Sequence, residues 1–191
     1  MLLFCCEKIV DFFIIHYNLS ATQRQWYIYS LETRIVMFFS IISMLLLGSL
    51  VSSISQVICF LLSILSLRRW LGGYHAQTPL RCLFLSMVVT IACLCFVNLI
   101  IKYNWDFLIW TTLIILSIAV FNSYPYTLKN CPRTSDELAI SWRKSKQLLA
   151  GDLSIAVVLQ IIPVDSNYVH YWAMGIIAAA ISFFVAKLKK E

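Results

Sequence analysis

Long stretches without a charged residue constrain this chain more than any other feature. They run through 35–67, 83–101, 107–128 and 166–186 and contain 33, 19, 22 and 21 residues. About eighteen apolar residues are enough for a helix to cross a bilayer. Hydrophobic residues make up 61% of the chain and charged residues 13%, whereas a soluble domain is about half apolar and about a quarter charged. This composition excludes a typical soluble domain and a long disordered chain.

The first stretch is too long for a single crossing. At about 1.5 Å per residue its 33 residues would reach roughly 50 Å, beyond a hydrocarbon core of about 30 Å. Its middle, 48–56, is rich in small and hydroxyl residues that suit a turn, so we predict spans at 35–50 and 54–67. The segment 147–164 carries one charge, Asp152, and is a further predicted span. We therefore expect an all-α, polytopic membrane protein with six transmembrane helices.

The basic residues favour this count. With six spans and both termini inside, fourteen of the fifteen Lys and Arg residues lie on the cytoplasmic side, as the positive-inside rule requires. Only Lys102 lies outside. A five-span alternative would leave four basic residues outside. The inner set is Lys8, Arg24, Arg34, Arg68, Arg69, Arg81, Lys129, Arg133, Arg143, Lys144, Lys146, Lys187, Lys189 and Lys190.

The N-terminal segment has a different character. Glu7, Lys8 and Asp11 interrupt its apolar run and fall on one side of a helix, and no small-residue cleavage site follows. We predict an amphipathic helix in the inner interface. The expected organisation is one membrane-embedded domain over 1–191, with the interfacial helix and a connector in 1–33 and a helical bundle in 34–191. Cys5 and Cys6 on this helix are either acylated or packed, and we favour packing.

The most unusual segment is 68–82, which reads Arg-Arg-Trp-Leu-Gly-Gly-Tyr-His-Ala-Gln-Thr-Pro-Leu-Arg-Cys. It lies between two predicted spans on the cytoplasmic side. The Gly72-Gly73 pair allows backbone conformations that other residues avoid, and Pro79 stops a helix from continuing through the segment. We therefore predict a shaped loop at the membrane surface.

Cys82 and His75 have the chemistry of a nucleophile and its base. A thiol attacks as the thiolate, so it needs a group that accepts its proton and surroundings that favour the anion. His75 can accept the proton, and the positive charges of Arg68, Arg69 and Arg81 favour the anion. Cys82 is also expected to begin a helix, whose dipole stabilises a thiolate and whose free N–H groups could form an oxyanion hole.

The remaining chemical groups receive mostly structural interpretations. Cys59, Cys93 and Cys95 fall in predicted spans and are interpreted as small core residues, and Cys131 as a loop thiol. The total of seven cysteines is odd and the predicted setting is cytoplasmic, and both facts argue against a disulfide framework. His16 and His170 are interpreted as interfacial residues, because neither has a second ligand at metal-binding spacing.

Asp152 is the one carboxylate inside a predicted span. Such a residue is costly in a membrane and is usually functional. It could orient His75 or pair with an arginine of the 68–82 loop for structural reasons, and we favour the structural pairing. Asp136 and Glu137 lie in a charged segment and are interpreted as solvated.

The run Arg69-Trp70-Leu71-Gly72-Gly73-Tyr74-His75-Ala76, followed by Cys82, resembles the signature of the accessory gene regulator B (AgrB) family. Its members are bacterial membrane cysteine peptidases that mature quorum-sensing peptides. The likeness extends to the length, the hydropathy profile and the basic inner loop from Pro125 to Pro132. It implies that His75 and Cys82 form the catalytic dyad. Residues expected to bind substrate or support the site are Arg68, Arg69, Gly72, Gly73, Tyr74, Arg81, Lys129 and Asp152.

The resemblance also implies a reaction and a set of partners. The substrate would be an AgrD-like propeptide, whose acidic tail is released while the remainder is held as a thioester and then cyclised to a thiolactone or lactone. The basic inner surface would attract this tail. Further expected partners are the lipid bilayer and a second copy of the chain, whereas nucleic acid, a cofactor and a metal ion are not expected.

Two other classes of function remain open at this point. A small peptide exporter would need a polar path, but the spans contain mostly the Ser, Thr, Asn and Gln residues typical of helix contacts. A noncatalytic scaffold would have no use for the Gly-Gly-Tyr-His loop. Either of these proteins should tolerate the replacement of Cys82 by alanine, whereas a cysteine peptidase should not.

Overall fold

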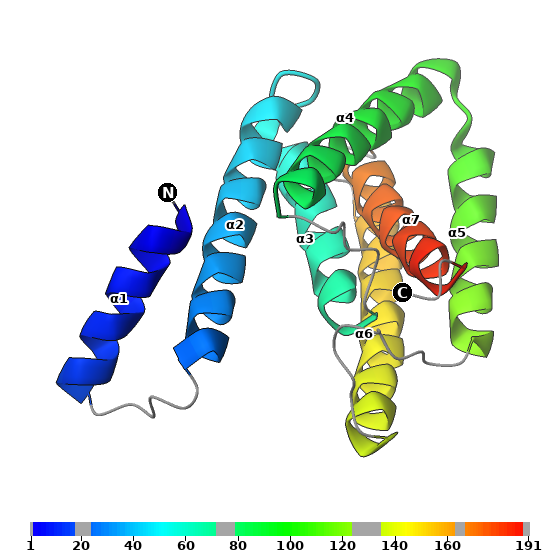
Figure 1. Cartoon of the computed structure of the whole chain (residues 1–191). Coiled ribbons are helices and arrows are strands. Elements are labelled where there is room, and N and C mark those ends of the chain that lie inside the picture. The colour runs from blue at the N-terminus through cyan, green and yellow to red at the C-terminus, as the bar shows by residue number, and fades with distance from the viewer. Residues whose placement is uncertain (1, 18–23, 72–78, 124–134, 163–166, 189–191) are drawn as a thin grey trace.

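A computed structural model describes residues 2–17, 24–71, 79–123, 135–162 and 167–188 (Figure 1). In these ranges the secondary structure is helical, without strands. The helices are α1 (Leu2–Tyr17), α2 (Arg24–Gly48), α3 (Ile54–Leu71), α4 (Pro79–Tyr103), α5 (Asp106–Asn122), α6 (Ser135–Ile161) and α7 (Asn167–Leu188). The expected all-α class is confirmed.

Helix α7 forms the centre of the bundle. It packs against α3, α4, α5 and α6, and Figure 1 shows it beside α3 and α5. Most of its side chains are buried, including those of Tyr171, Met174 and Phe183. It is rich in alanine, and such small residues let neighbouring helix backbones approach closely in a membrane protein.

Helices α3 and α7 approach each other closely at Gly175. A Cβ atom at this position would lie 1.7 Å from Ser63 Oγ and 2.7 Å from the carbonyl oxygen of Phe60. Both distances are shorter than any normal contact, so no larger residue fits while the two helices keep this spacing. Gly175 thus sets how closely the two central helices can pack.

Each of the six predicted spans overlaps one of the helices α2 to α7, although the bounds differ. The break predicted within 35–67 is present: α2 ends at Gly48, a turn follows, and α3 begins at Ile54. Helix α2 begins at Arg24, so part of the expected connector is helical. Helix α5 ends at Asn122, earlier than the charge-free stretch, because Ser123 is extended and Pro125 follows.

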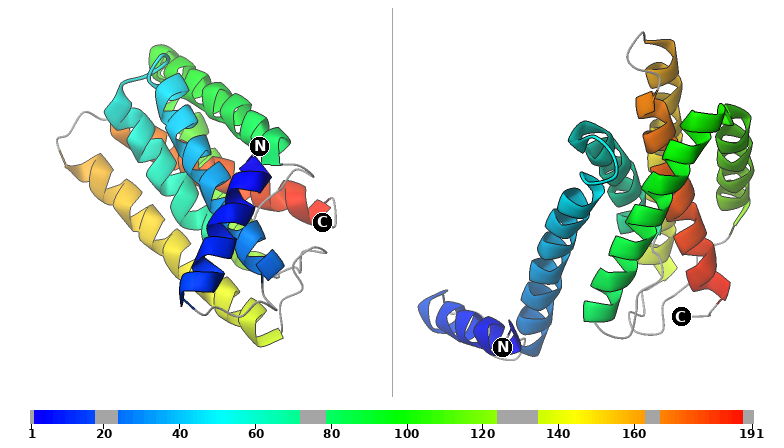
Figure 2. Two further views of the ribbon diagram at one scale, coloured as in Figure 1. Left: turned by 60° about the vertical axis from the view of Figure 1, so that its left-hand side comes forward. Right: turned by 90° about the horizontal axis from the view of Figure 1, so that it is seen from above.

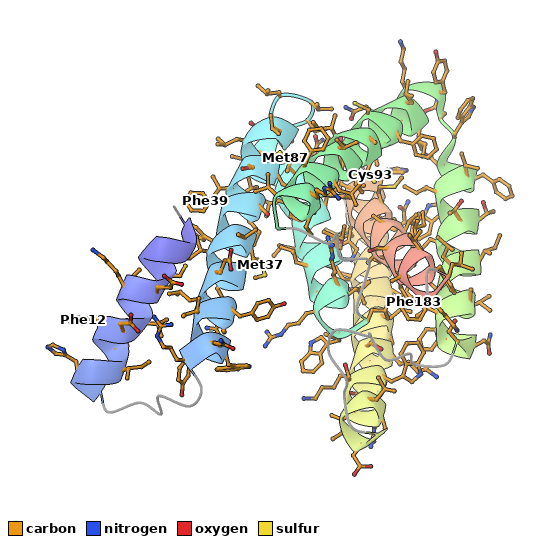
Figure 3. The ribbon with its side chains drawn as sticks, viewed as in Figure 1. Phe12, Met37, Phe39, Met87, Cys93 and Phe183 are labelled. Carbon is orange, nitrogen blue, oxygen red and sulfur yellow. The ribbon has the colours of Figure 1, made fainter. Side chains whose placement is uncertain are left out.

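The outer surface of the bundle is apolar. Large hydrophobic side chains are exposed on every helix; among them are Phe12, Phe38, Leu62, Phe84, Phe107, Val157 and Ile181. Water-soluble monomers rarely expose so much apolar surface. Figure 3 shows Phe12 on α1 and Met37 and Phe39 on α2, each more than half exposed. These surfaces suit the hydrocarbon interior of a membrane.

Within the described ranges, four helices are long and apolar enough to cross a membrane: α2, α3, residues Arg81–Tyr103 of α4, and α7. Helix α5 is apolar but has only 17 residues. Helix α6 has 27 residues, about 40 Å of helix, and its first half carries Arg143, Lys144 and Lys146. By length and composition alone, four of the six predicted spans therefore qualify.

Helix α1 packs on α2. Cys6 and Val10 of α1 are buried against Ile28 of α2, which agrees with the packed interpretation of Cys6. The guanidinium of Arg24 donates two hydrogen bonds to the Asp11 carboxylate, at 2.6 and 2.8 Å. These bonds hold the pKa of Asp11 below its usual value. The contact ties α1 to the first residue of α2.

The helices alternate in direction. In the right-hand view of Figure 2, the starts of α2 and α4 and the end of α7 lie at one end of the molecule. The α2–α3 turn and the α4–α5 turn lie at the opposite end. Helix α1 lies at the first end, where it packs against the first part of α2. This up-and-down order brings the end of α3 and the start of α4 toward the same end as α1.

Candidate functional site

The structure describes the two ends of the 68–82 segment. Arg68, Arg69 and Trp70 belong to the last turn of α3, which ends at Leu71, and α4 begins at Pro79. The predicted base His75 lies in 72–78, outside the described residues, as do Gly72, Gly73 and Tyr74. Lys129 of the basic inner loop also lies outside them. The site is therefore built from the two helix ends that frame the loop.

Cys82 lies in the first turn of α4, as predicted from the sequence. Pro79 occupies the first helical position, where the missing N–H of proline costs no hydrogen bond. The Cys82 side chain is half-buried. The first N–H groups of a helix have no acceptor within the helix and carry partial positive charge. The start of α4 therefore offers an environment that favours an anionic group.

Basic residues surround the end of α3 and the start of α4. Arg69 and Arg81 are exposed, whereas Arg68 is half-buried. The guanidinium carbon of Arg69 lies 5.5 Å from the centroid of the Trp70 ring, a cation–π arrangement. Arg143 and Lys144, in the first half of α6, are exposed as well. Positive charge thus collects around the end of α3 and on the neighbouring part of α6.

Asp152 is buried in α6 and retains only 5% exposure. Its Oδ2 accepts a hydrogen bond of 2.7 Å from Ser66 Oγ of α3. Its backbone carbonyl accepts a bond of 3.0 Å from Nε1 of Trp172 in α7. Among the described residues Asp152 makes no ion pair with an arginine of the 68–82 segment, and a pairing with an arginine stays a prediction. The described partner of the carboxylate is a serine hydroxyl on the facing helix.

The Ser66 hydroxyl has two acceptors within reach. Its oxygen lies 2.7 Å from Asp152 Oδ2 and 2.9 Å from the carbonyl oxygen of Ser63 in its own helix. A hydroxyl carries one hydrogen and can donate it to only one acceptor at a time. The Asp152 side chain and the α3 backbone therefore compete for one donor. The Ser66–Asp152 bond joins α3 to α6, and the Trp172 bond to the Asp152 carbonyl adds α7. Ser66 lies within two turns of the end of α3.

Some polar residues of the structure were not anticipated from the sequence. Ser66 is one of several serines in the predicted spans. Ser141 of α6, whose hydroxyl donates to the Trp70 carbonyl oxygen at 3.1 Å, lies in a segment rich in charged residues. His170 was interpreted as an interfacial residue, but it is buried, and its Nε2 lies 2.9 Å from Asp106 Oδ1. These contacts join residues 64 or more positions apart, so no local spacing could reveal them.

Comparisons with known proteins extend over most of the chain. A family model described as accessory gene regulator B matches residues 6–185. The chain is 26% identical over 145 residues to "Putative AgrB-like protein 2" of Clostridium perfringens strain 13, which covers 71% of this chain and 64% of that protein. It is 25% identical over 138 residues to a second AgrB-like protein, from C. perfringens strain SM101, with 69% and 61% covered. The chain thus matches less than two thirds of the length of either relative. No solved structure matches the chain.

Proposed function

Because the chain belongs to the accessory gene regulator B family, we propose that it is a membrane cysteine endopeptidase that matures a quorum-sensing propeptide. It would remove the C-terminal tail of an AgrD-like precursor and cyclise the remainder. The observation that carries this proposal is the family match over 6–185, which includes both His75 and Cys82. The position of Cys82 in the first turn of α4 supports it.

The reaction follows from the chemistry of a thiol beside an imidazole. His75 takes the proton of Cys82, and the thiolate attacks the carbonyl carbon of the peptide bond before the tail. The carbon–nitrogen bond then breaks, and the imidazolium returns its proton to the leaving amine. A cysteine thiol or serine hydroxyl of the propeptide next attacks the resulting thioester. The ring closes, and Cys82 leaves as a thiol after regaining a proton.

The surroundings of Cys82 support each stage of this reaction. The N-terminus of α4 favours the thiolate, and its free N–H groups could bind the oxyanion of the tetrahedral intermediate. The positive charges of Arg68, Arg69 and Arg81 act in the same direction and would attract an acidic tail. Formation of a thioester from a peptide bond is uphill, so removal of the tail or of the product must draw the reaction forward.

We propose a six-span topology in which both termini and the 68–82 loop face the cytoplasm of a bacterial cell. The alternating helix directions are consistent with it, and α1 would lie in the inner interface with its apolar side toward lipid. Fourteen basic residues then lie inside. In this topology α5 and the second half of α6 also cross the membrane.

Single engineered cysteines test the topology. In a background without native cysteines, a membrane-impermeant thiol reagent added to intact cells should label positions 50, 104 and 166. Positions 77 and 130 should be labelled only after the membrane is opened. Labelling of position 77 from outside would mean that the loop faces the other way.

Asp152 is expected to matter mainly for stability. Asp152→Ala removes the hydrogen bond that joins α6 to α3, so the unfolding temperature should fall, because such a bond contributes about 0.5–1.5 kcal/mol to stability. The Ser66 hydroxyl keeps the Ser63 carbonyl as an acceptor. Asp152→Asn should have a smaller effect, since its amide can donate to Ser66 Oγ. Thermal unfolding in detergent measures both. Wild-type stability of Asp152→Ala, together with turnover lowered more than tenfold, would show instead that Asp152 orients His75.

Reconstitution tests the proposed activity. The purified protein in liposomes is given a synthetic propeptide with an amphipathic helix, a central cysteine and an acidic tail, taken from a small open reading frame beside the gene. We expect release of the tail without added nucleotide, and an N-terminal product one water lighter than the free acid. A product present only as the free acid would contradict cyclisation, and an intact propeptide would contradict the whole proposal.

A further inference from the structure

Helix α6 contacts the last turn of α3, directly before the segment that carries His75. The Ser141 hydroxyl, in the first half of α6, donates a hydrogen bond of 3.1 Å to the carbonyl oxygen of Trp70. Trp70 is the last residue but one of α3, so this bond joins the end of α3 to α6. The last carbonyls of a helix need donors from elsewhere. A buried serine of α6 therefore caps the C-terminus of α3.

Lys144 reinforces the same contact. Its ammonium nitrogen lies 4.5 Å from the centroid of the Trp70 ring, within cation–π range. Ser141 and Lys144 are three residues apart and share one face of α6. A positive charge near the C-terminus of a helix also interacts favourably with the helix dipole. The two residues thus hold the side chain and the backbone of Trp70 at once.

Two neighbours in α6 have the same residue types without this contact. The Ser145 hydroxyl donates to the carbonyl of Trp142 in its own helix, at 2.8 Å. The Lys146 ammonium lies 5.4 Å from the centroid of the Trp142 ring, also in its own helix. Neither of these two contacts reaches α3. Ser145 and Lys146 therefore provide matched controls for Ser141 and Lys144.

We propose that Ser141 and Lys144 are positioning residues that fix the end of α3, from which the loop with His75 starts. This inference rests on the proposed function. Trp70 precedes His75 by five residues, and Cys82 is held separately by α4. The distance between base and nucleophile therefore depends on how firmly the two helix ends are held. Loosening the end of α3 should reduce the fraction of molecules in which His75 reaches Cys82.

The expected effect is on kcat. A misplacement of about 1 Å can cost about a hundredfold in rate, so partial loosening in Ser141→Ala or Lys144→Met should lower kcat about tenfold. KM should change less than about twofold in Ser141→Ala, which removes no charge. In Lys144→Met it should match the KM of Lys146→Met, which removes an equal charge from the same basic surface. Lys144→Arg keeps the cation over the ring and should restore most of the rate. Ser145→Ala and Lys146→Met should match the wild type in kcat.

A second measurement separates positioning from stability. The rate at which iodoacetamide alkylates Cys82 is followed against pH by mass spectrometry of the peptide that contains it. In Ser141→Ala and Lys144→Met, the profile should move toward that of His75→Ala, because the base meets the thiol less often. In Ser145→Ala and Lys146→Met it should stay at the wild-type position. A change in stability alone would not move this profile.

The outcomes distinguish the two proposals. If Ser141→Ala and Lys144→Met match their controls in kcat and in alkylation profile while Cys82→Ala is inactive, the positioning role is wrong and the proposed function stands. If a well-folded Cys82→Ala protein still cleaves, the proposed function itself is wrong. Should Ser141→Ala fail to fold, Lys144→Met decides the question, because Lys144 is exposed and its removal leaves no cavity.

Discussion

Replacement of Cys82 by alanine is expected to abolish propeptide cleavage completely. The proposed reaction passes through a thioester on this sulfur, and alanine offers no nucleophile in its place. Because Cys82 is only half-buried at the start of α4, the smaller side chain should leave the fold intact. Cleavage is measured by mass spectrometry after co-expression with the propeptide. A peptide exporter or a scaffold would tolerate the change.

The companion variant His75→Ala should lower cleavage by about 10²–10⁴, the usual contribution of a general base. Cys59→Ala and Cys131→Ala serve as controls and should retain most of the activity. Cys59 lies half-buried within α3, away from the loop in sequence. If the loss in Cys59→Ala were as large as in Cys82→Ala, the assignment of the nucleophile would be wrong.

Gly175 should be the most sensitive structural position of the bundle. Its missing Cβ would lie 1.7 Å from Ser63 Oγ and 2.7 Å from the Phe60 carbonyl oxygen, so Gly175→Leu would force α3 and α7 apart. Overpacking of a core costs about 1–3 kcal/mol and occasionally more, and backbone atoms cannot turn aside as a side chain can. We expect little or no folded protein in detergent by fluorescence-detected size-exclusion chromatography.

Gly151 provides the matched control on α6. A Cβ there would meet nothing within 4 Å, so Gly151→Ala should fold normally. Its free energy of unfolding should even rise by up to about 1 kcal/mol, because alanine is a better helix former than glycine. Gly175→Ala should be destabilised, and Ser63→Ala should relieve only part of the damage, since the Phe60 carbonyl remains. Wild-type stability of Gly175→Leu would contradict the described packing of α3 on α7.

Most helices were predictable, because the length of an apolar stretch and the residues that end a helix are both local properties of the sequence. A charge-free stretch of 33 residues cannot form one span, and the structure divides it at the Gly48–Ser53 turn. Pro79 cannot continue a helix but suits the first turn of one, and α4 begins there. The resemblance to the AgrB family, read from the run around His75 and Cys82, is confirmed by the family match.

The contacts between helices could not be predicted in the same way. Asp152 was recognised as a costly residue, but its partner is Ser66, 86 positions away, and not an arginine of the described loop ends. A serine within a span gives no sign of which helix it faces. The capping of Trp70 by Ser141 spans 71 positions and depends on how α6 packs beside α3. Composition and spacing predict each helix by itself. Contacts such as Asp152–Ser66 and Ser141–Trp70 depend on how the helices pack against one another.

The central claim is that Cys82 forms a thioester with the propeptide, and the intact mass of the protein tests it directly. When the ring-closing residue of the propeptide is changed to alanine, the enzyme should accumulate with the N-terminal fragment attached to Cys82. Hydroxylamine should remove this adduct, and Cys82→Ala should never show it. Tail release in the same experiment without any adduct, or with an adduct on another residue, would contradict the account.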